Sequence, residues 1–250
     1  MRDTLDNLIR TFFDLKVMAD VFPDLLTRGL PNTLLLTAGA VAIGLVFGLI
    51  LAILLLSARW WLSFPAKVIV DILRGVPGLL VIFVIGFGLP IAGITFLGRD
   101  AYPYAMIAVG ITEGAYMAEI IRAGIQSIDK GQTEASRSLG ISSWQTMRSV
   151  VLPQGLRRVL PPMTGQVIIT LKATSLVYVL GLMPDQQEIF AVAQSGTSQY
   201  ATMSPMVLAG IMYLVITVPL THLVNAWDKR MRSGRRSAPA AAAMGASHEV

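Results

Sequence analysis

The sequence contains no cysteine and only two histidines, His222 and His248. Without cysteine, the chain can form neither a disulfide framework nor a thiolate metal site, and it has no cysteine nucleophile. Two histidines are too few for a histidine metal cluster. We therefore expect no metal site and no bound cofactor in this chain.

Charged residues are scarce. They make up 14% of the chain, while 54% is hydrophobic and the mean hydropathy is +0.65; about a quarter of a soluble domain is charged. Several apolar runs reach the ~20 residues that a helix needs to cross ~30 Å of hydrocarbon. These runs are continuous and do not alternate with a period of two, which favours helices over a closed barrel. The chain is therefore predicted to be an all-α integral membrane protein.

Nucleotide and catalytic motifs are also missing. The sequence has no G-x-x-x-x-G-K-[ST] phosphate loop and no nucleophile elbow. We therefore expect that the chain is not an enzyme and does not hydrolyse ATP. A membrane-embedded enzyme is the alternative from another class, but no set of catalytic groups can be assembled at one membrane depth.

The apolar runs predict five spans, at about 29–57, 67–90, 103–123, 160–183 and 203–227. Two of the 20 basic residues lie at or within spans. If the C-terminus is cytoplasmic, 13 of the others lie on the cytoplasmic side and five on the opposite side. Basic residues accumulate on the cytoplasmic side. The N-terminus is therefore predicted outside and the C-terminus inside. The net charge of +5 is interpreted as an orientation signal and predicts no nucleic-acid partner.

Two flanking segments differ from the predicted transmembrane domain at 29–230. Residues 1–28 include an amphipathic stretch, 5–22, which predicts a helix lying in the outer interface or, equally, packed on the first span. Residues 231–250 are rich in alanine, serine and glycine and predict a disordered cytoplasmic tail.

Small residues recur at four-residue spacing in the first span, at Ala40, Gly44, Gly48 and Ala52. Such a stripe lets two helix backbones approach closely. We therefore predict that this face packs against another helix.

The longest inside loop, 124–159, predicts structure of its own. Its pattern indicates a short helix over 131–138, a break at Gly140, and a second short helix capped by Ser142 or Ser143. Pro153 is expected to close the unit. A compact helix–turn–helix in the cytosol could transmit a force from another protein to the membrane helices.

This loop also carries a family signature. Glu134-Ala135-Ser136 is followed after three residues by Gly140, and after nine more by Val150-Val151-Leu152-Pro153. The pattern resembles the Glu-Ala-Ala loop (EAA motif) of permeases in binding-protein-dependent ABC importers. In that family the loop is a coupling helix that docks into a groove on the ATPase subunit.

The resemblance implies roles for the residues of the loop. Glu134 would pair with a basic group of the ATPase, Ala135 and Gly140 would allow close approach, and Leu139 would pack in the groove. The residues assigned to ATPase coupling are Gly131, Glu134, Ala135, Ser136, Leu139, Gly140, Leu152 and Pro153.

Further motifs resemble the polar amino-acid branch of that family, whose substrates include histidine, glutamate, glutamine, arginine and opines. They include Arg74-Gly75-Val76-Pro77, the stretch from Ala115 to Ile125, Leu152-Pro153-Gln154 and Lys172-Ala173-Thr174-Ser175-Leu176. The resemblance covers about residues 29–230. It implies the type I importer permease fold with about five transmembrane helices, in the bacterial cytoplasmic (inner) membrane.

The chain departs from this branch at polar positions. Ala173 stands where aspartate is expected, Val81 where glutamine is usual, and Thr164-Gly165-Gln166 replaces Thr-Asn-Glu. Glu113 stands where a small polar residue is usual. The residues assigned to the substrate path are Glu113, Tyr116, Gln166, Thr174 and Ser175.

Ionisable groups at membrane depth need partners or water. Glu119 and Arg122 are three residues apart on a helix and are predicted to pair, as are Asp71 and Arg74. Glu113 has no such neighbour. It is expected either to face a water-filled path or to pair with another helix.

The resemblance implies a set of partners: an ABC ATPase dimer that binds ATP and Mg²⁺, a second identical or homologous permease, a periplasmic or lipid-anchored solute-binding protein, a small polar solute and the lipid membrane. Transport would proceed by alternating access. The alternatives are a permease for opines or another small solute, such as a sulphur amino acid, and an ion-driven carrier without an ATPase. An ion-driven carrier is disfavoured because no paired repeats are found.

Overall fold

The computed structural model describes the backbone of residues 2–233 and the side chains of residues 4–226, so most of the tail predicted at 231–250 lies outside the described residues. The described part is helical apart from turns and one isolated bridge between Phe96 and Gly98. The helices are α1 (Arg2–Phe12), α2 (Leu15–Asp24), α3 (Leu30–Leu55), α4 (Trp60–Gly75), α5 (Gly78–Phe83), α6 (Leu89–Ile91), α7 (Ala101–Gln126), α8 (Lys130–Ser138), α9 (Ser143–Thr146), α10 (Leu152–Ala173), α11 (Ile189–Tyr200) and α12 (Ser204–Ser233). π-helical turns at Leu25–Gly29, Val84–Gly88 and Met147–Val151, and a 3₁₀ helix at Thr174–Leu180, join some of them.

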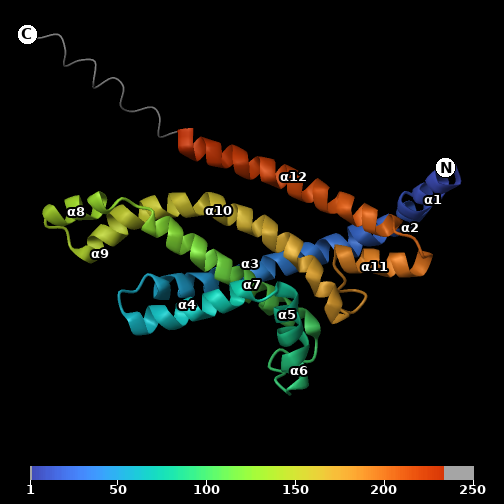
Figure 1. The fold of residues 1–250 in the computed structure, drawn as a ribbon, viewed down its shortest axis with the longest axis horizontal. Helices are drawn as coiled ribbons and strands as arrows, with labels where there is room; N and C mark the ends of the chain where they lie inside the picture. Colours follow the sequence, from blue (N-terminus) through green and yellow to red (C-terminus); the bar gives the residue numbers. More distant parts are fainter. Residues whose placement is uncertain (1, 234–250) are drawn as a thin grey trace, which may run out of the picture.

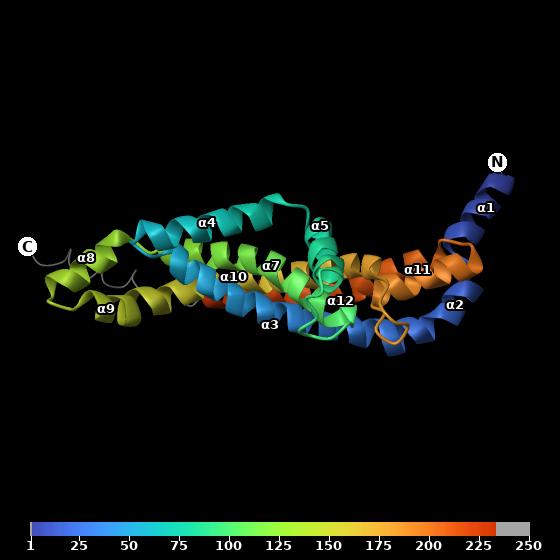
Figure 2. The same cartoon turned by 90° about the horizontal axis from the view of Figure 1, so that it is seen from below.

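The long helices lie side by side in an elongated bundle. In Figures 1 and 2, α3, α7, α10 and α12 run along the long axis, with α8 and α9 at one end and α2 and α11 at the other. Four helical segments of the described part are long and apolar enough to cross a membrane, or up to five if the bent pair of α4 and α5–α6 counts as one span. The predicted number of about five is therefore confirmed.

The second predicted span, 67–90, is wrong as a single straight helix. α4 begins earlier, at Trp60, and the chain bends by 104° between Gly75 and Gly78. Proline disfavours the helical conformation of the residue before it, and Val76, which precedes Pro77, is extended (φ −86°, ψ 136°). α5 and α6 consequently leave the bundle as a transverse arm (Figure 1).

Helices α3 and α7 approach each other through glycines, which confirms the packing role of the small-residue stripe. A Cβ atom on Gly48 would lie 2.7 Å from the carbonyl oxygen of Gly114, and one on Gly44 would lie 3.0 Å from that of Gly110. The reverse holds as well, because a Cβ atom on Gly114 would lie 2.9 Å from the carbonyl oxygen of Gly44. The contact therefore depends on glycine on both helices. The sequence pattern indicated the glycines of α3 but not their counterparts on α7, Gly110 and Gly114.

The N-terminal segment forms two helices where one amphipathic helix over 5–22 was predicted. The chain breaks at Phe13 and Asp14, where the Asp14 side chain accepts hydrogen bonds from the backbone N–H groups of Lys16 and Val17 and so caps α2. α2 packs against α11 and α12, with Val21 and Leu25 in an apolar cluster with residues of both helices. α2 therefore belongs to the bundle. α1 keeps exposed apolar side chains, and its place at the outer interface stays a prediction.

A buried carboxylate holds this outer end together. Glu188 is fully buried and caps α11 by accepting hydrogen bonds from the backbone N–H groups of Phe190 (2.6 Å) and Ala191 (2.8 Å). The Tyr213 hydroxyl on α12 donates a third hydrogen bond to it (3.1 Å). The backbone N–H of Ile189 donates to the Thr33 hydroxyl on α3 (3.1 Å). These contacts join α3, α11 and α12.

Gly48→Ala tests the glycine contact between α3 and α7. Alanine is the better helix former by about 1 kcal/mol, but its Cβ atom would lie within 3.0 Å of the Gly114 carbonyl. We expect a net loss of about 1–3 kcal/mol, the usual cost of overpacking, measured as a lower melting temperature in detergent. Gly210→Ala is the matched control, because its Cβ atom would meet nothing within 4 Å; equal melting temperatures for the two variants would contradict the role of the contact.

Glu188 predicts a pH dependence of stability. Burial raises its pKa from the ordinary 4.5 to about 7, although the hydrogen bonds from Phe190, Ala191 and Tyr213 favour the carboxylate. Between these values the folded protein holds a proton that the unfolded chain has released, so this group lowers the free energy of unfolding as the pH rises from 4.5 to about 7. Above that range its contribution is constant.

Melting curves across this pH range provide the measurement. Glu188→Gln removes the titrating group, so we expect a shallower dependence of melting temperature on pH than in the wild type. Asp185→Asn, a neighbouring exposed carboxyl, is the control and keeps the wild-type slope. An unchanged slope in Glu188→Gln would show that another group titrates.

Candidate functional site

The inside loop folds into a two-helix unit, α8 and α9, at one end of the bundle (Figure 1). Asp129 caps α8 by accepting a hydrogen bond from the backbone N–H of Gly131 (2.7 Å). Gly140 ends α8 in a left-handed conformation (φ +79°), and the backbone N–H of Ile141 donates to the carbonyl of Ser136 (3.2 Å). This is the hydrogen-bond pattern of a Schellman motif, for which glycine is the preferred residue. Ser142 then caps α9, so the predicted helix, break and cap are confirmed.

The coupling tip, defined here as residues 130–147, carries large apolar side chains on its surface. Leu139 is 81% exposed and Trp144 is 73% exposed. Glu134 is exposed too, and it makes no ion pair with another residue of the described part. Isolated exposed apolar residues are common, but two large ones on a small polar unit mark a surface that can bind a partner.

The other residues assigned to coupling divide into two groups. Gly131, Ala135 and Gly140 are exposed with Glu134 and Leu139 on α8 and its C-terminal turn. Ser136 is buried, and its hydroxyl donates to the carbonyl of Gln132 (2.8 Å). Ser136 therefore stabilises the tip itself and is not available to a partner.

The expectation that Pro153 closes the unit is wrong. Leu152 and Pro153 form the first turn of α10, where proline is tolerated because its missing N–H is not needed. The chain from Ser143 to Leu180 is one helical segment, so the helix that contains the fourth predicted span begins before residue 160. The tip is therefore a direct extension of α10.

Glu113 and Gln166 form a buried pair in the bundle. Glu113 on α7 is 7% exposed and Gln166 on α10 is 6% exposed. The Gln166 side-chain amide donates a hydrogen bond to the Glu113 carboxylate. Of the two alternatives for Glu113, pairing with another helix is the one found. In the family that the chain resembles, a glutamate is usual at the position of Gln166. In this chain the carboxylate stands on the facing helix α7 instead, at Glu113.

The remaining residues assigned to the substrate path do not join this pair. The Tyr116 hydroxyl donates to the backbone carbonyl of Arg74 (3.4 Å). Thr174 donates to the carbonyl of Leu171, and Ser175 donates to that of Lys172 (2.7 Å each). Both hydroxyls therefore donate to backbone carbonyls at the end of their own helix. Of the five residues assigned to the substrate path, the structure brings together only Glu113 and Gln166.

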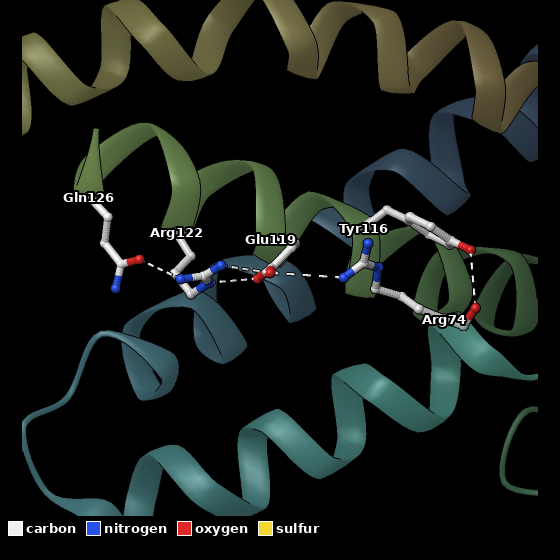
Figure 3. A network of polar contacts seen from close by, with 5 residues as sticks. All are labelled: Arg74, Tyr116, Glu119, Arg122 and Gln126. Carbon is white, nitrogen blue, oxygen red and sulfur yellow. Dashed lines mark hydrogen bonds and ion pairs between the residues drawn. The ribbon is translucent and has the colours of Figure 1, made fainter. Parts of the chain in front are cut away.

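A second polar network, which sequence reasoning found only in part, connects α4 with α7 (Figure 3). The predicted pair of Glu119 and Arg122 is confirmed, with two N–H···O distances of 2.7 Å. Arg74 lies 3.9 Å from Glu119 and 5.2 Å from the centre of the Tyr116 ring. The predicted pair of Asp71 and Arg74 is wrong, because Arg74 points across to α7. The partner of Arg74 depends on how α4 packs on α7. The spacing of residues within α4 does not predict that packing.

Comparisons with known proteins agree with this arrangement. Residues 44–233 match the family described as "Binding-protein-dependent transport system inner membrane component". The glutamine transport system permease protein GlnP of Escherichia coli (strain K12) is 35% identical over 223 residues, which cover 88% of this chain and 98% of the relative. The octopine transport system permease protein OccM of Rhizobium radiobacter is 34% identical over 232 residues, which cover 90% and 93%.

A solved structure, "Crystal structure of an amino acid ABC transporter with histidines", matches with a TM-score of 0.78 and 32% identity over 87% of this chain and 98% of that chain. The predicted all-α permease fold is thereby confirmed. The chain therefore belongs to the family of inner membrane components of binding-protein-dependent transport systems, in which it is a multi-pass permease subunit.

Proposed function

We propose that this permease forms part of the translocation path for a polar amino acid and couples to a separate ATPase subunit through residues 131–153. The observation that carries the proposal is the coupling tip, which lies at one end of the bundle (Figure 1). Its Leu139 and Trp144 side chains are exposed. A groove on a partner would bury both side chains, which favours association by about 1.5–3 kcal/mol for each fully buried large apolar side chain.

The geometry of the tip supports mechanical coupling. α8 follows α7 after a short turn, and α9 continues into α10. The Arg158 guanidinium on α10 donates a hydrogen bond to the carbonyl of Ser127 in that turn, so the two attachments are themselves joined. A force on the tip therefore acts on α7 and α10 together, the two helices that carry Glu113 and Gln166.

The family to which the chain belongs supports a set of partners. ATP and Mg²⁺ would be bound by an ATPase dimer, one ATPase subunit contacting each tip, and this chain would contribute no cofactor site. A second permease, identical or homologous, would complete the path, and a periplasmic or lipid-anchored binding protein would deliver the solute. The exposed apolar side chains of the α5–α6 arm, such as Phe83, Val84 and Ile91, offer surface for the second permease or for lipid.

The buried pair is the best candidate for solute selection. A carboxylate in an apolar bundle stabilises a positively charged group strongly, and every amino acid in zwitterionic form carries an ammonium group. The Gln166 amide donates a hydrogen bond to Glu113. A solute that binds here would replace that hydrogen bond. The similarity to OccM favours an opine as the second candidate class of solute.

Glu134→Lys tests the coupling role. We expect loss of solute uptake while the permease remains in the membrane at its wild-type level, because the new charge opposes a basic partner group. Uptake of a panel of radiolabelled amino acids and immunoblots of membranes give the two readings. Thr133→Lys is the control, since it introduces the same lysine side chain about 100° around the helix without removing an acidic group. Wild-type uptake in Glu134→Lys would overturn the proposed role.

Glu113→Gln tests solute selection. We expect uptake of the preferred solute to fall about tenfold or more, since hydrogen bonds to charged groups contribute about 1.5–3 kcal/mol. The order of preference across the panel should change, while ATP hydrolysis by the assembled transporter is kept. The double variant Glu113→Gln/Gln166→Glu returns a carboxylate to the pair and should recover part of the preference. Unchanged uptake of every solute in Glu113→Gln would contradict the proposal.

A further inference from the structure

A cavity of about 490 Å³ lies between α4 and α7 near the end of the bundle that carries the coupling tip. Pockets for small ligands are typically about 300–1,000 Å³. Charged side chains line both walls, with Lys67 and Asp71 on α4 and Glu119 and Arg122 on α7. Trp60 and Phe64 add aromatic surface at its edge. None of these residues belongs to the Glu113 pair or to the coupling tip.

The charges on the two walls differ in how well they are satisfied. On α7, Arg122 and Glu119 hold each other through two hydrogen bonds, and Figure 3 shows both side chains on the side of α7 that faces α4. On α4, neither Lys67 nor Asp71 forms an ion pair with another described side chain. They lie four residues apart, about one helical turn. The cavity thus offers one positive and one negative group, one turn apart on the same helix, that make no ion pair within the described residues.

We propose that this cavity binds a zwitterion, with its anionic group beside Lys67 and its ammonium group beside Asp71. Charged groups near the hydrocarbon are costly unless they are paired or hydrated, and a zwitterion supplies both counter-charges without adding net charge. A purely anionic ligand pairs Lys67 but leaves Asp71 facing a like charge. The aromatic edge suits an amphiphilic molecule, since aromatic side chains favour the membrane interface.

Two sources offer this chemistry: the phosphoethanolamine head group of an inner-leaflet phospholipid and a free α-amino acid from the cytoplasm. Both place an ammonium group a few bonds from an anionic group. The inference concerns binding and does not depend on the proposed transport function, so its test uses no transport reading.

The lipid arm uses the transporter purified from membranes with the subunits that accompany it. After delipidation, it is placed in vesicles of phosphatidylethanolamine or of phosphatidylglycerol, re-extracted in mild detergent, and the retained lipid is counted by native mass spectrometry. The amino-acid arm titrates the same preparation with glutamine and records tryptophan fluorescence, because Trp60 lines the cavity. Trp60→Phe identifies the signal that comes from this residue.

We expect at least one arm to show binding that the double variant Lys67→Gln/Asp71→Asn weakens tenfold or more. Arg157→Gln, which removes an exposed charge on α10, should leave it unchanged, and so should Glu113→Gln, which separates this cavity from the buried pair. Selective retention of phosphatidylethanolamine identifies the lipid as the source, and a glutamine-dependent Trp60 signal identifies the free amino acid. Equal retention of both lipids together with no glutamine signal, or binding that the double variant leaves intact, overturns the proposal.

Discussion

The close contact between α3 and α7 is the constraint on which the rest of the structure depends. Gly44 and Gly48 on α3 meet Gly110 and Gly114 on α7 with backbone atoms almost touching. Once these glycines define the face of α7 that lies on α3, the other faces follow from helical periodicity. Glu113 is turned to α10, and Glu119 is turned to α4. The glycine contact thus helps to specify both polar contacts.

The two ends of the bundle are stabilised by different means. The outer end is closed by the buried Glu188, which joins α11 and α12 through hydrogen bonds to backbone and to Tyr213. The inner end carries a small polar unit whose backbone hydrogen bonds are satisfied locally by Asp129, Gly140 and Ser142. A locally satisfied unit keeps its shape when it moves, which suits a segment that receives force from a partner.

Local signals accounted for the parts of the site that depend on neighbouring residues. The helix over 131–138, the left-handed Gly140 and the cap at Ser142 each depend on contacts within a few residues, so short-range chemistry predicted them. Pairing of Glu119 with Arg122 was predictable for the same reason. Pro153 was misread because proline fits both the end of one helix and the first turn of the next, and only the path of the chain through α10 distinguishes the two.

The sequence by itself determined the class of protein, its orientation in the membrane and its family, because hydropathy, basic-residue bias and motif spacing are properties of the chain. Tertiary structure decided the partners of the charged residues: Glu113 with Gln166, and Arg74 with Glu119 in place of Asp71. It also decided that α4 ends in a 104° bend and that a cavity lined by Lys67 and Asp71 opens beside it. These features arise where helices distant in sequence meet. The rotation of each helix about its axis and its shift along its neighbour are set by side-chain packing between helices, and no local sequence pattern encodes that packing.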